Sequence, residues 1–157
     1  MIAAFDGPVV ITLNGLQSGA QPGSALRILV PTGGSSHARL ATEVGLALAK
    51  ATGGTLTVLH VFAPQENTNL LRGRASRPGR SVLVDARRLG KRSGVRIDAL
   101  TSMNSSPEIA IRRAASAGRY DLVVLGTSLH VGDKKFLSPG IEALVRAIRI
   151  PILLVAQ

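Results

Sequence analysis

Short apolar runs alternate along this chain with stretches of helical period, and this alternation constrains the fold more than any other feature. Five runs rich in Val, Leu and Ile read as strands, at residues 27–31, 55–62, 95–100, 121–126 and 150–156. Segments between them place apolar residues three and four positions apart, as an amphipathic helix does. Strands alternating with helices predict βαβ units. Because such crossovers are right-handed, we expect an open, doubly wound α/β sheet with helices on both faces.

The pattern within each run predicts its place in the sheet. The runs at 27–31, 121–126 and 150–156 are nearly continuous in apolar residues, which is typical of strands covered on both faces. The run at 95–100 alternates apolar with charged residues and therefore predicts an edge strand.

Helix boundaries are marked by capping residues. A helix over 38–50 should stop at Gly53, and Ser106 and Ser138, each followed by a proline, should be N-caps of two further helices. Residues 64–80 show neither period and predict a long loop, which leads into a helix over 81–92.

Length and local composition predict the domain organisation. The 157 residues suffice for one domain, which we place over 27–157 after a leader or linker over 1–26. Residues 17–24 have the composition of a flexible connector. Residues 9–13 could form a short extra strand or be the remainder of an upstream segment. We identify no secretory signal and no run near the ~20 apolar residues that span a bilayer, so we expect a cytoplasmic location.

The charge predicts an anionic partner. Lys and Arg number 19 against 9 Asp and Glu, a net charge of +10, and many of the cations lie between Arg72 and Arg96. An anionic membrane surface could bind this stretch. Nucleic acid is disfavoured, because only 3% of residues are aromatic and no DNA- or RNA-binding motif accompanies the cations.

Two Gly- and Ser-rich turns are the best candidates for a binding site. They follow the runs at 27–31 and 121–126, and ligands of open α/β sheets bind at the carboxyl ends of such strands. Backbone N–H groups with the hydroxyls of Ser128 and Ser138 could hold a phosphate. The glycines could equally serve backbone geometry alone.

Enzymatic chemistry is disfavoured. The segment 126–130 partly matches the G-x-S-x-G nucleophile elbow, but His130 replaces the last glycine. The three histidines, His37, His60 and His130, are scattered, and the chain has no Cys, so we expect no metal site, no thiol nucleophile and no disulfide. We therefore predict a protein that is not an enzyme.

Four stretches together resemble the universal stress protein family. They are RILVP at 27–31 followed by Gly34 and Ser35, LTVLHV at 56–61, ASAGRYDLVVLG at 115–126, and IPILLV at 150–155. The resemblance implies a Rossmann-like, five-stranded parallel sheet of order 3-2-1-4-5, with the five strands numbered along the chain. It also implies homodimers that pair through the last strand and, in one branch of the family, ATP binding where the strand order reverses.

That branch carries G-x-x-G, nine residues, then G-[ST], and this chain matches the motif in part. Gly126 matches the first glycine, Leu129 stands at the second, and the final pair falls within 138–140 with an ambiguity of one residue. Gly33 stands where the family has an acidic residue that contacts the nucleotide. The resemblance implies that ATP or a related adenine nucleotide would be held by Pro31, Thr32, Gly33, Val61, Gly126, Ser128, Gly132, Ser138 and Gly140.

A narrower resemblance rests on VPTGGS at 30–35, GTSL at 126–129 and Gly132-Asp133. These are similar to universal-stress domains that follow the membrane part of bacterial cation/proton antiporters. The implied function is a cytoplasmic, non-enzymatic regulatory domain at the inner face of the membrane, with a transporter in the same chain or complex as its partner. Two alternatives stay open: a stand-alone stress-response protein that binds ATP, and a ligand-free dimeric interaction module.

Overall fold

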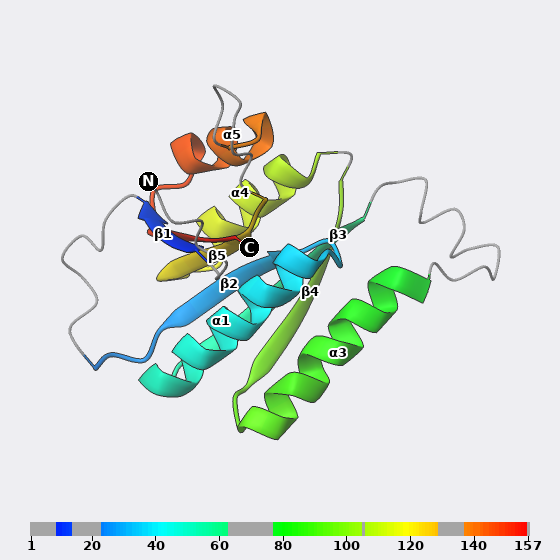
Figure 1. Ribbon diagram of the computed structural model, residues 1–157, viewed down its shortest axis with the longest axis vertical. Coiled ribbons are helices and arrows are strands. Elements are labelled where there is room, and N and C mark those ends of the chain that lie inside the picture. Colours follow the sequence, from blue (N-terminus) through cyan, green and yellow to red (C-terminus); the bar gives the residue numbers. More distant parts are fainter. Residues whose placement is uncertain (1–8, 14–22, 63–76, 105, 129–136, 157) are drawn as a thin grey trace, which may run out of the picture.

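The computed structural model describes residues 9–13, 23–62, 77–104, 106–128 and 137–156. Figure 1 shows them as a twisted sheet with helices on both faces. The strands are β1 (Val9–Leu13), β2 (Arg27–Thr32), β3 (Thr55–Phe62), β4 (Ile97–Met103), β5 (Leu122–Gly126) and β6 (Ile152–Ala156). The helices are α1 (Ser36–Thr52), α3 (Arg77–Ser93), α4 (Pro107–Ala117) and α5 (Pro139–Ala147). None of these helices is long and apolar enough to cross a membrane.

The sheet has the order β1-β6-β5-β2-β3-β4. Strands β2 to β6 run parallel in the predicted order, and β4 lies at the predicted edge. The prediction of an open five-stranded, purely parallel sheet is wrong, because β1 adds a sixth strand that pairs antiparallel with β6. Ile11 and Leu13 of β1 pack against the core, which gives this strand a buried face. Its sequence indicated extended structure but carried no information about which edge it would join.

The core lies in two layers, one on each side of the sheet. Ile28 and Val30 of β2 point toward the layer that α1 and α3 cover, whereas Leu29 points toward the layer of α4 and α5. All three side chains are fully buried. The alternation explains why β2 is apolar throughout, since both of its faces are covered.

Serines and a glycine set the helix boundaries largely as predicted. Ser35 caps α1 by accepting a hydrogen bond from the Ala38 N–H at 3.2 Å, and Gly53 ends that helix with a φ of 64°. Ser138 caps α5 through the Ile141 N–H at 3.4 Å. Ser106 occupies the N-cap position of α4, but its hydroxyl donates to Glu108 instead of capping.

Several boundaries differ from the predictions, and α1, for example, covers 36–52 rather than 38–50. Helix α3 begins at Arg77, four residues before the predicted start, because Pro78 is tolerated in a first turn whose N–H groups need no helical partner. Strand β4 covers 97–103 rather than 95–100. Of the loop predicted over 64–80, residues 64–76 lie outside the described residues, and residues 77–80 belong to α3.

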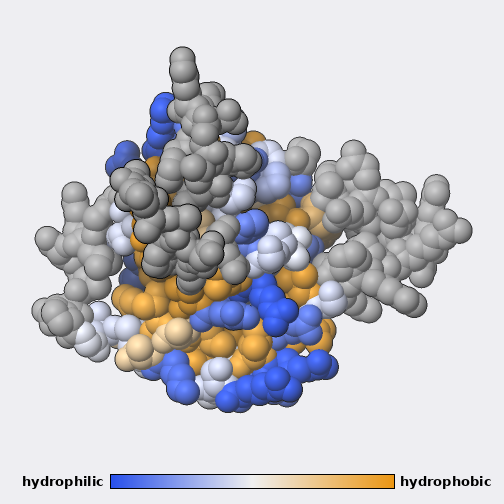
Figure 2. All heavy atoms as spheres, in the orientation of Figure 1, coloured by the Kyte–Doolittle hydropathy of each residue, from blue (hydrophilic) through white to orange (hydrophobic). Residues whose placement is uncertain are grey.

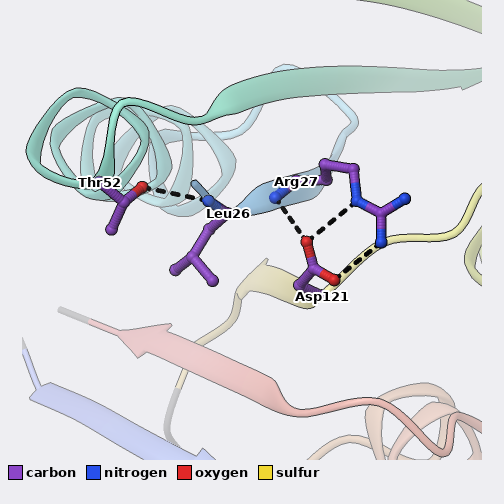
Figure 3. Close-up of polar contacts among 4 residues, drawn as sticks. All are labelled: Leu26, Arg27, Thr52 and Asp121. Atoms are coloured by element: carbon purple, nitrogen blue, oxygen red, sulfur yellow. Dashed lines mark hydrogen bonds and ion pairs between the residues drawn. The ribbon is translucent and has the colours of Figure 1, made fainter. Parts of the chain in front are cut away.

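An ion pair joins β2 to the start of β5 at the amino ends of the strands (Figure 3). The Arg27 guanidinium donates to both carboxylate oxygens of Asp121, at 3.1 and 2.9 Å, and the Arg27 N–H donates to the same carboxylate at 2.8 Å. These bonds lower the pKa of Asp121, and the partnership raises the pKa of Arg27. Nearby, the Leu26 N–H donates to the Thr52 hydroxyl at 3.4 Å.

Candidate functional site

The carboxyl ends of three neighbouring strands form the candidate site. Strand β2 lies between β3 and β5, and the strand order reverses between β2 and β5. Thr32 is in register with His60 of β3, and extending the β2–β5 register places Thr32 beside Gly126. The strand register therefore brings Pro31, Thr32 and Val61 to the same carboxyl end of the sheet as Gly126, and Gly33 and Ser128 directly follow β2 and β5 there. This edge is the switch point at which open α/β sheets bind ligands.

Thr32 anchors the turn that follows β2. The residue is buried, with 6% of its surface exposed, and its hydroxyl accepts a hydrogen bond from the Gly34 N–H at 3.4 Å. Its carbonyl oxygen lies 3.0 Å from His60 Nδ1. A carbonyl can only accept, so this imidazole nitrogen carries the proton. His60 is thus occupied in holding the turn, and sequence analysis had not included it among the site residues.

Gly126 is required by packing, whether or not a ligand binds. A Cβ at this position would lie 2.2 Å from the His37 carbonyl oxygen and 2.3 Å from its carbonyl carbon, at the start of α1. The structural reason for this glycine is therefore the close approach of β5 to α1. Beyond it, Thr127 is buried and its N–H donates to the Val155 carbonyl at 2.9 Å. Ser128 is exposed at the same edge.

Gly33 is different, because among the described residues the space that its side chain would occupy is open. A Cβ built there meets no atom within 4 Å, and Gly33 is not among the glycines with positive φ. The position can accept an acidic side chain without rearrangement. Its neighbour Gly34 has a φ of 85°, and a Cβ there would touch Val82 of α3 at 3.1 Å. Of these two glycines, only Gly34 is demanded by the backbone.

Ser138 and Gly140 lie at the start of α5, the helix that follows β5. Gly140 faces α4, since a Cβ there would lie 2.5 Å from Oε1 of Glu108. Gly132, the remaining predicted site residue, lies outside the described residues, as do Leu129 and His130. The described candidate residues supply hydroxyls and backbone groups and include no cation. They fit the hydrogen-bonding groups of a nucleoside better than the charge of a triphosphate.

A cavity of about 490 Å³ opens beside this edge, between α1 and α3. Thr32 lines it together with Gly34 and Ser35 from the turn, but Gly126 and Ser128 do not. Three arginines line it, Arg39, Arg88 and Arg92. Arg88 and Arg92 belong to the stretch from Arg72 to Arg96 for which an anionic partner was predicted, whereas Arg39 and the groove itself were not predicted. The four-residue spacing of Arg88 and Arg92 was the available signal, because it places both on one side of a helix. Figure 2 shows hydrophilic residues in blue beside apolar residues in orange on this view of the molecule.

The sequence model of the Universal stress protein family matches residues 25–156. The chain belongs to this family. A universal stress protein family member from Burkholderia pseudomallei is 27% identical with a TM-score of 0.66, and the match covers 83% of this chain and 95% of that one. No curated protein sequence matches the chain.

Two further solved structures share the fold at lower identity. A family protein from Arabidopsis thaliana with AMP bound is 18% identical, with a TM-score of 0.62 and coverage of 84% of this chain and 92% of that one. A universal stress protein in complex with cAMP is 20% identical, with a TM-score of 0.63 and coverage of 83% and 97%. Leader strand β1 lies outside the part of the chain that the family model matches.

Proposed function

We propose that this universal stress protein is a non-enzymatic sensing domain that binds an adenine nucleotide weakly at the carboxyl edge of β2, β3 and β5. The observation that carries the proposal is the convergence of Thr32, Val61 and Ser128 at the switch point of the sheet. Relatives of the same fold are described with AMP and with cAMP. Weak binding follows from Gly33, which offers no carboxylate to the ribose or the base.

Calorimetry with ATP, AMP and cAMP tests this proposal on wild type, Gly33→Asp and Gly33→Ala. Space around Gly33 is open, so both variants should fold as wild type does. We expect Gly33→Asp to tighten binding of at least one nucleotide about tenfold, because a carboxylate accepts hydrogen bonds from nucleoside hydroxyl or amino groups. Gly33→Ala should bind as wild type does. If no nucleotide gives a binding heat with wild type or with Gly33→Asp, the proposal of nucleotide binding is wrong, and a ligand-free interaction module is favoured.

The non-enzymatic part of the proposal rests on the donor set. The described candidate residues include no carboxylate and no imidazole, and the nearby His60 Nδ1 is bonded to a carbonyl. Phosphate release from ATP should therefore equal the uncatalysed rate in wild type and in Ser128→Ala. Hydrolysis that disappears in Ser128→Ala would make the protein an enzyme and Ser128 its nucleophile.

We further propose that the domain acts in the cytoplasm on a bacterial cation/proton antiporter, in the same chain or complex. The support is the likeness of VPTGGS at 30–35 and GTSL at 126–129 to domains in that setting. The observation that tests it is the genomic reading frame around this sequence. We expect a transporter in the same frame or beside it. Its absence from both would contradict the antiporter link and leave nucleotide binding unaffected, in favour of a stand-alone stress-response protein.

The homodimer expected through the last strand stays a prediction, and β1 sets a condition on it. Strand β1 pairs with β6 over five residues, so a second copy can reach the β6 edge only if β1 leaves. Ile11→Asp should loosen β1, because Ile11 packs against the core, and so promote dimers in light scattering over a concentration series. Val10→Asp is the matched control, since Val10 is 50% exposed on the opposite face. Dimers that are equally strong in all three proteins would place the interface elsewhere.

A further inference from the structure

We propose that the groove between α1 and α3 is a second ligand site, which binds a small polyanion carrying two or more phosphate groups. The ligand would be held by Arg39 of α1 and by Arg88 and Arg92 of α3. This site is adjacent to the switch point at Thr32, but the arginines that would hold its ligand are not among the residues proposed to bind the nucleotide. Ligand binding in the groove can therefore be tested independently of nucleotide binding at the switch point.

The groove has the size and the lining of a small-molecule site. Its volume of about 490 Å³ lies within the roughly 300–1,000 Å³ of typical ligand pockets. Hydroxyl groups of Ser35 and Thr42 line it from the α1 side. Thr42 donates its only hydroxyl proton to the Ala38 carbonyl at 2.8 Å, so it is not a donor for an anion, whereas the Ser35 hydroxyl accepts from the Ala38 N–H in its capping bond and can donate its own proton to a ligand. A cavity of this polarity is filled by water or by a polar ligand rather than left dry.

The charge of the lining selects an anion. Three arginines line the groove against one acidic residue, Asp85. Within the part of the chain that the structure describes, Arg88 and Arg92 make no ion pair. Arg39 pairs with Glu43 at 3.3 Å, but both side chains are largely exposed, so this pair stabilises little and can be exchanged for a ligand. Guanidinium groups bind phosphate through two parallel hydrogen bonds, which makes arginine a favoured phosphate ligand.

Helix α3 carries a repulsion that such a ligand would relieve. Arg88 and Arg92 are four residues apart, as are Arg87 and Lys91, and Asp85 is the only acidic residue in the helix. Like charges at this spacing destabilise a helix. The position near the helix C-terminus offsets part of that cost through the helix dipole. An anion bound between α1 and α3 would screen the Arg88–Arg92 pair directly, whereas Arg87 and Lys91 do not line this groove and line a different hollow.

The pair Arg87 and Lys91 provides a matched control. Arg87 and Lys91 line a second hollow together with Arg96. None of the residues that line this hollow carries a hydroxyl group, and Arg96 is paired with Asp98 at 3.4 Å. The double variant Arg88→Gln/Arg92→Gln removes two charges from the groove. The double variant Arg87→Gln/Lys91→Gln removes two charges from the same helix, also four residues apart, and leaves the groove lining intact.

Titration calorimetry with pyrophosphate on the full chain is the decisive experiment. We expect wild type to bind, Arg88→Gln/Arg92→Gln to lose about tenfold or more in affinity, and Arg87→Gln/Lys91→Gln to stay within about threefold of wild type. Circular dichroism should show both variants folded, and pyrophosphate should raise the melting temperature of wild type and of the control but not of the groove variant. Equal losses in the two variants would overturn the site in favour of a diffuse basic surface.

A second arm separates a free phosphate ligand from a lipid headgroup. Vesicles of phosphatidylcholine with cardiolipin, whose headgroup carries two phosphates, are sedimented with each protein. If wild type binds pyrophosphate, selective loss in the groove variant supports a free ligand. If wild type binds only vesicles, with the same selective loss, the groove takes a lipid headgroup. Vesicle binding that both variants weaken equally, without pyrophosphate binding, would overturn the groove and favour a membrane-facing surface, and no binding of either probe would also overturn it.

Discussion

The two ends of the parallel strands are held together in different ways. At the amino ends, Arg27 and Asp121 join β2 to the start of β5 through three hydrogen bonds that include a charged pair. At the carboxyl ends, the turn after β2 is held by neutral bonds, from His60 to the Thr32 carbonyl and from the Gly34 N–H to the Thr32 hydroxyl. At the amino ends the charged side chains are paired with each other, whereas the residues at the carboxyl ends present hydroxyl and backbone groups.

This difference separates stability from function along a single strand. Charged groups at the amino end already have partners within the fold, so they offer little to a ligand. At the carboxyl end, Ser128 is exposed and the space around Gly33 is open. Binding sites of α/β proteins draw on loops that a rigid sheet positions. The carboxyl end should therefore tolerate substitutions wherever the space is open, and the amino end should lose stability when its charged pair is removed.

The largest effect is expected at Gly126, where an added Cβ would overlap backbone atoms. Gly126→Ala should lower the free energy of unfolding by about 3 kcal/mol, because its Cβ would overlap the backbone of His37 and force α1 away from β5. Urea denaturation followed by circular dichroism measures the change.

Gly33→Ala is the control for this prediction. Its Cβ would meet no atom, so the free energy of unfolding should change by less than about 0.5 kcal/mol. A similar loss in both variants would show that the carboxyl end tolerates no added side chain and would remove the contrast between its two glycines.

Much of the fold could be predicted because its signals are local and repeated. The apolar runs of β2, β5 and β6 correspond to strands that both helix layers cover, and Ser35, Gly53 and Ser138 mark real helix ends. The sixth strand shows the limit. Residues 9–13 are rich in β-branched residues, as strands are, but their pairing with β6 joins segments more than a hundred residues apart, and nothing in five residues encodes a partner at that distance.

The candidate site could be predicted in outline but not in its roles. Sequence analysis placed Thr32, Val61, Gly126 and Ser128 at one edge, and the register brings those strand ends together. It left open whether the glycines serve a ligand or the backbone, which depends on tertiary distances such as that from Gly126 to His37. The groove was not predicted, because Arg39 and Arg88 are far apart in sequence and line one cavity only when α1 and α3 pack on the same face of the sheet.

The amino-end pair should give a smaller, pH-dependent effect. Asp121→Asn should lower the free energy of unfolding by about 1 kcal/mol at neutral pH, a value reduced for the partial exposure of both side chains. The pKa of Asp121 is lowered in the folded state, so its stabilisation is present above the unfolded pKa and is lost as the pH falls through the folded one. Wild type and variant should therefore begin to converge as the pH falls below about 4, the ordinary aspartate pKa, and should meet only below the lower folded pKa.

Asp98→Asn tests whether that effect belongs to the joined strand ends or to any ion pair. The Arg96–Asp98 pair is more exposed, with a separation of 3.4 Å, so its removal should cost less than about 0.5 kcal/mol at every pH. An equal loss for Asp98→Asn would mean that the Arg27–Asp121 contact has no special role in holding β2 to β5.

The smallest effect is expected at the helix starts of the carboxyl side. Ser138→Ala removes the acceptor for the Ile141 N–H and should cost about 0.5–1 kcal/mol. Ser106→Ala removes a hydroxyl that donates to Glu108 and caps nothing, so its cost should stay under about 0.5 kcal/mol. Urea denaturation of both variants in one buffer measures the difference. If Ser106→Ala costs as much as Ser138→Ala, the bond from the Ile141 N–H to the Ser138 hydroxyl has no special role in holding the start of α5.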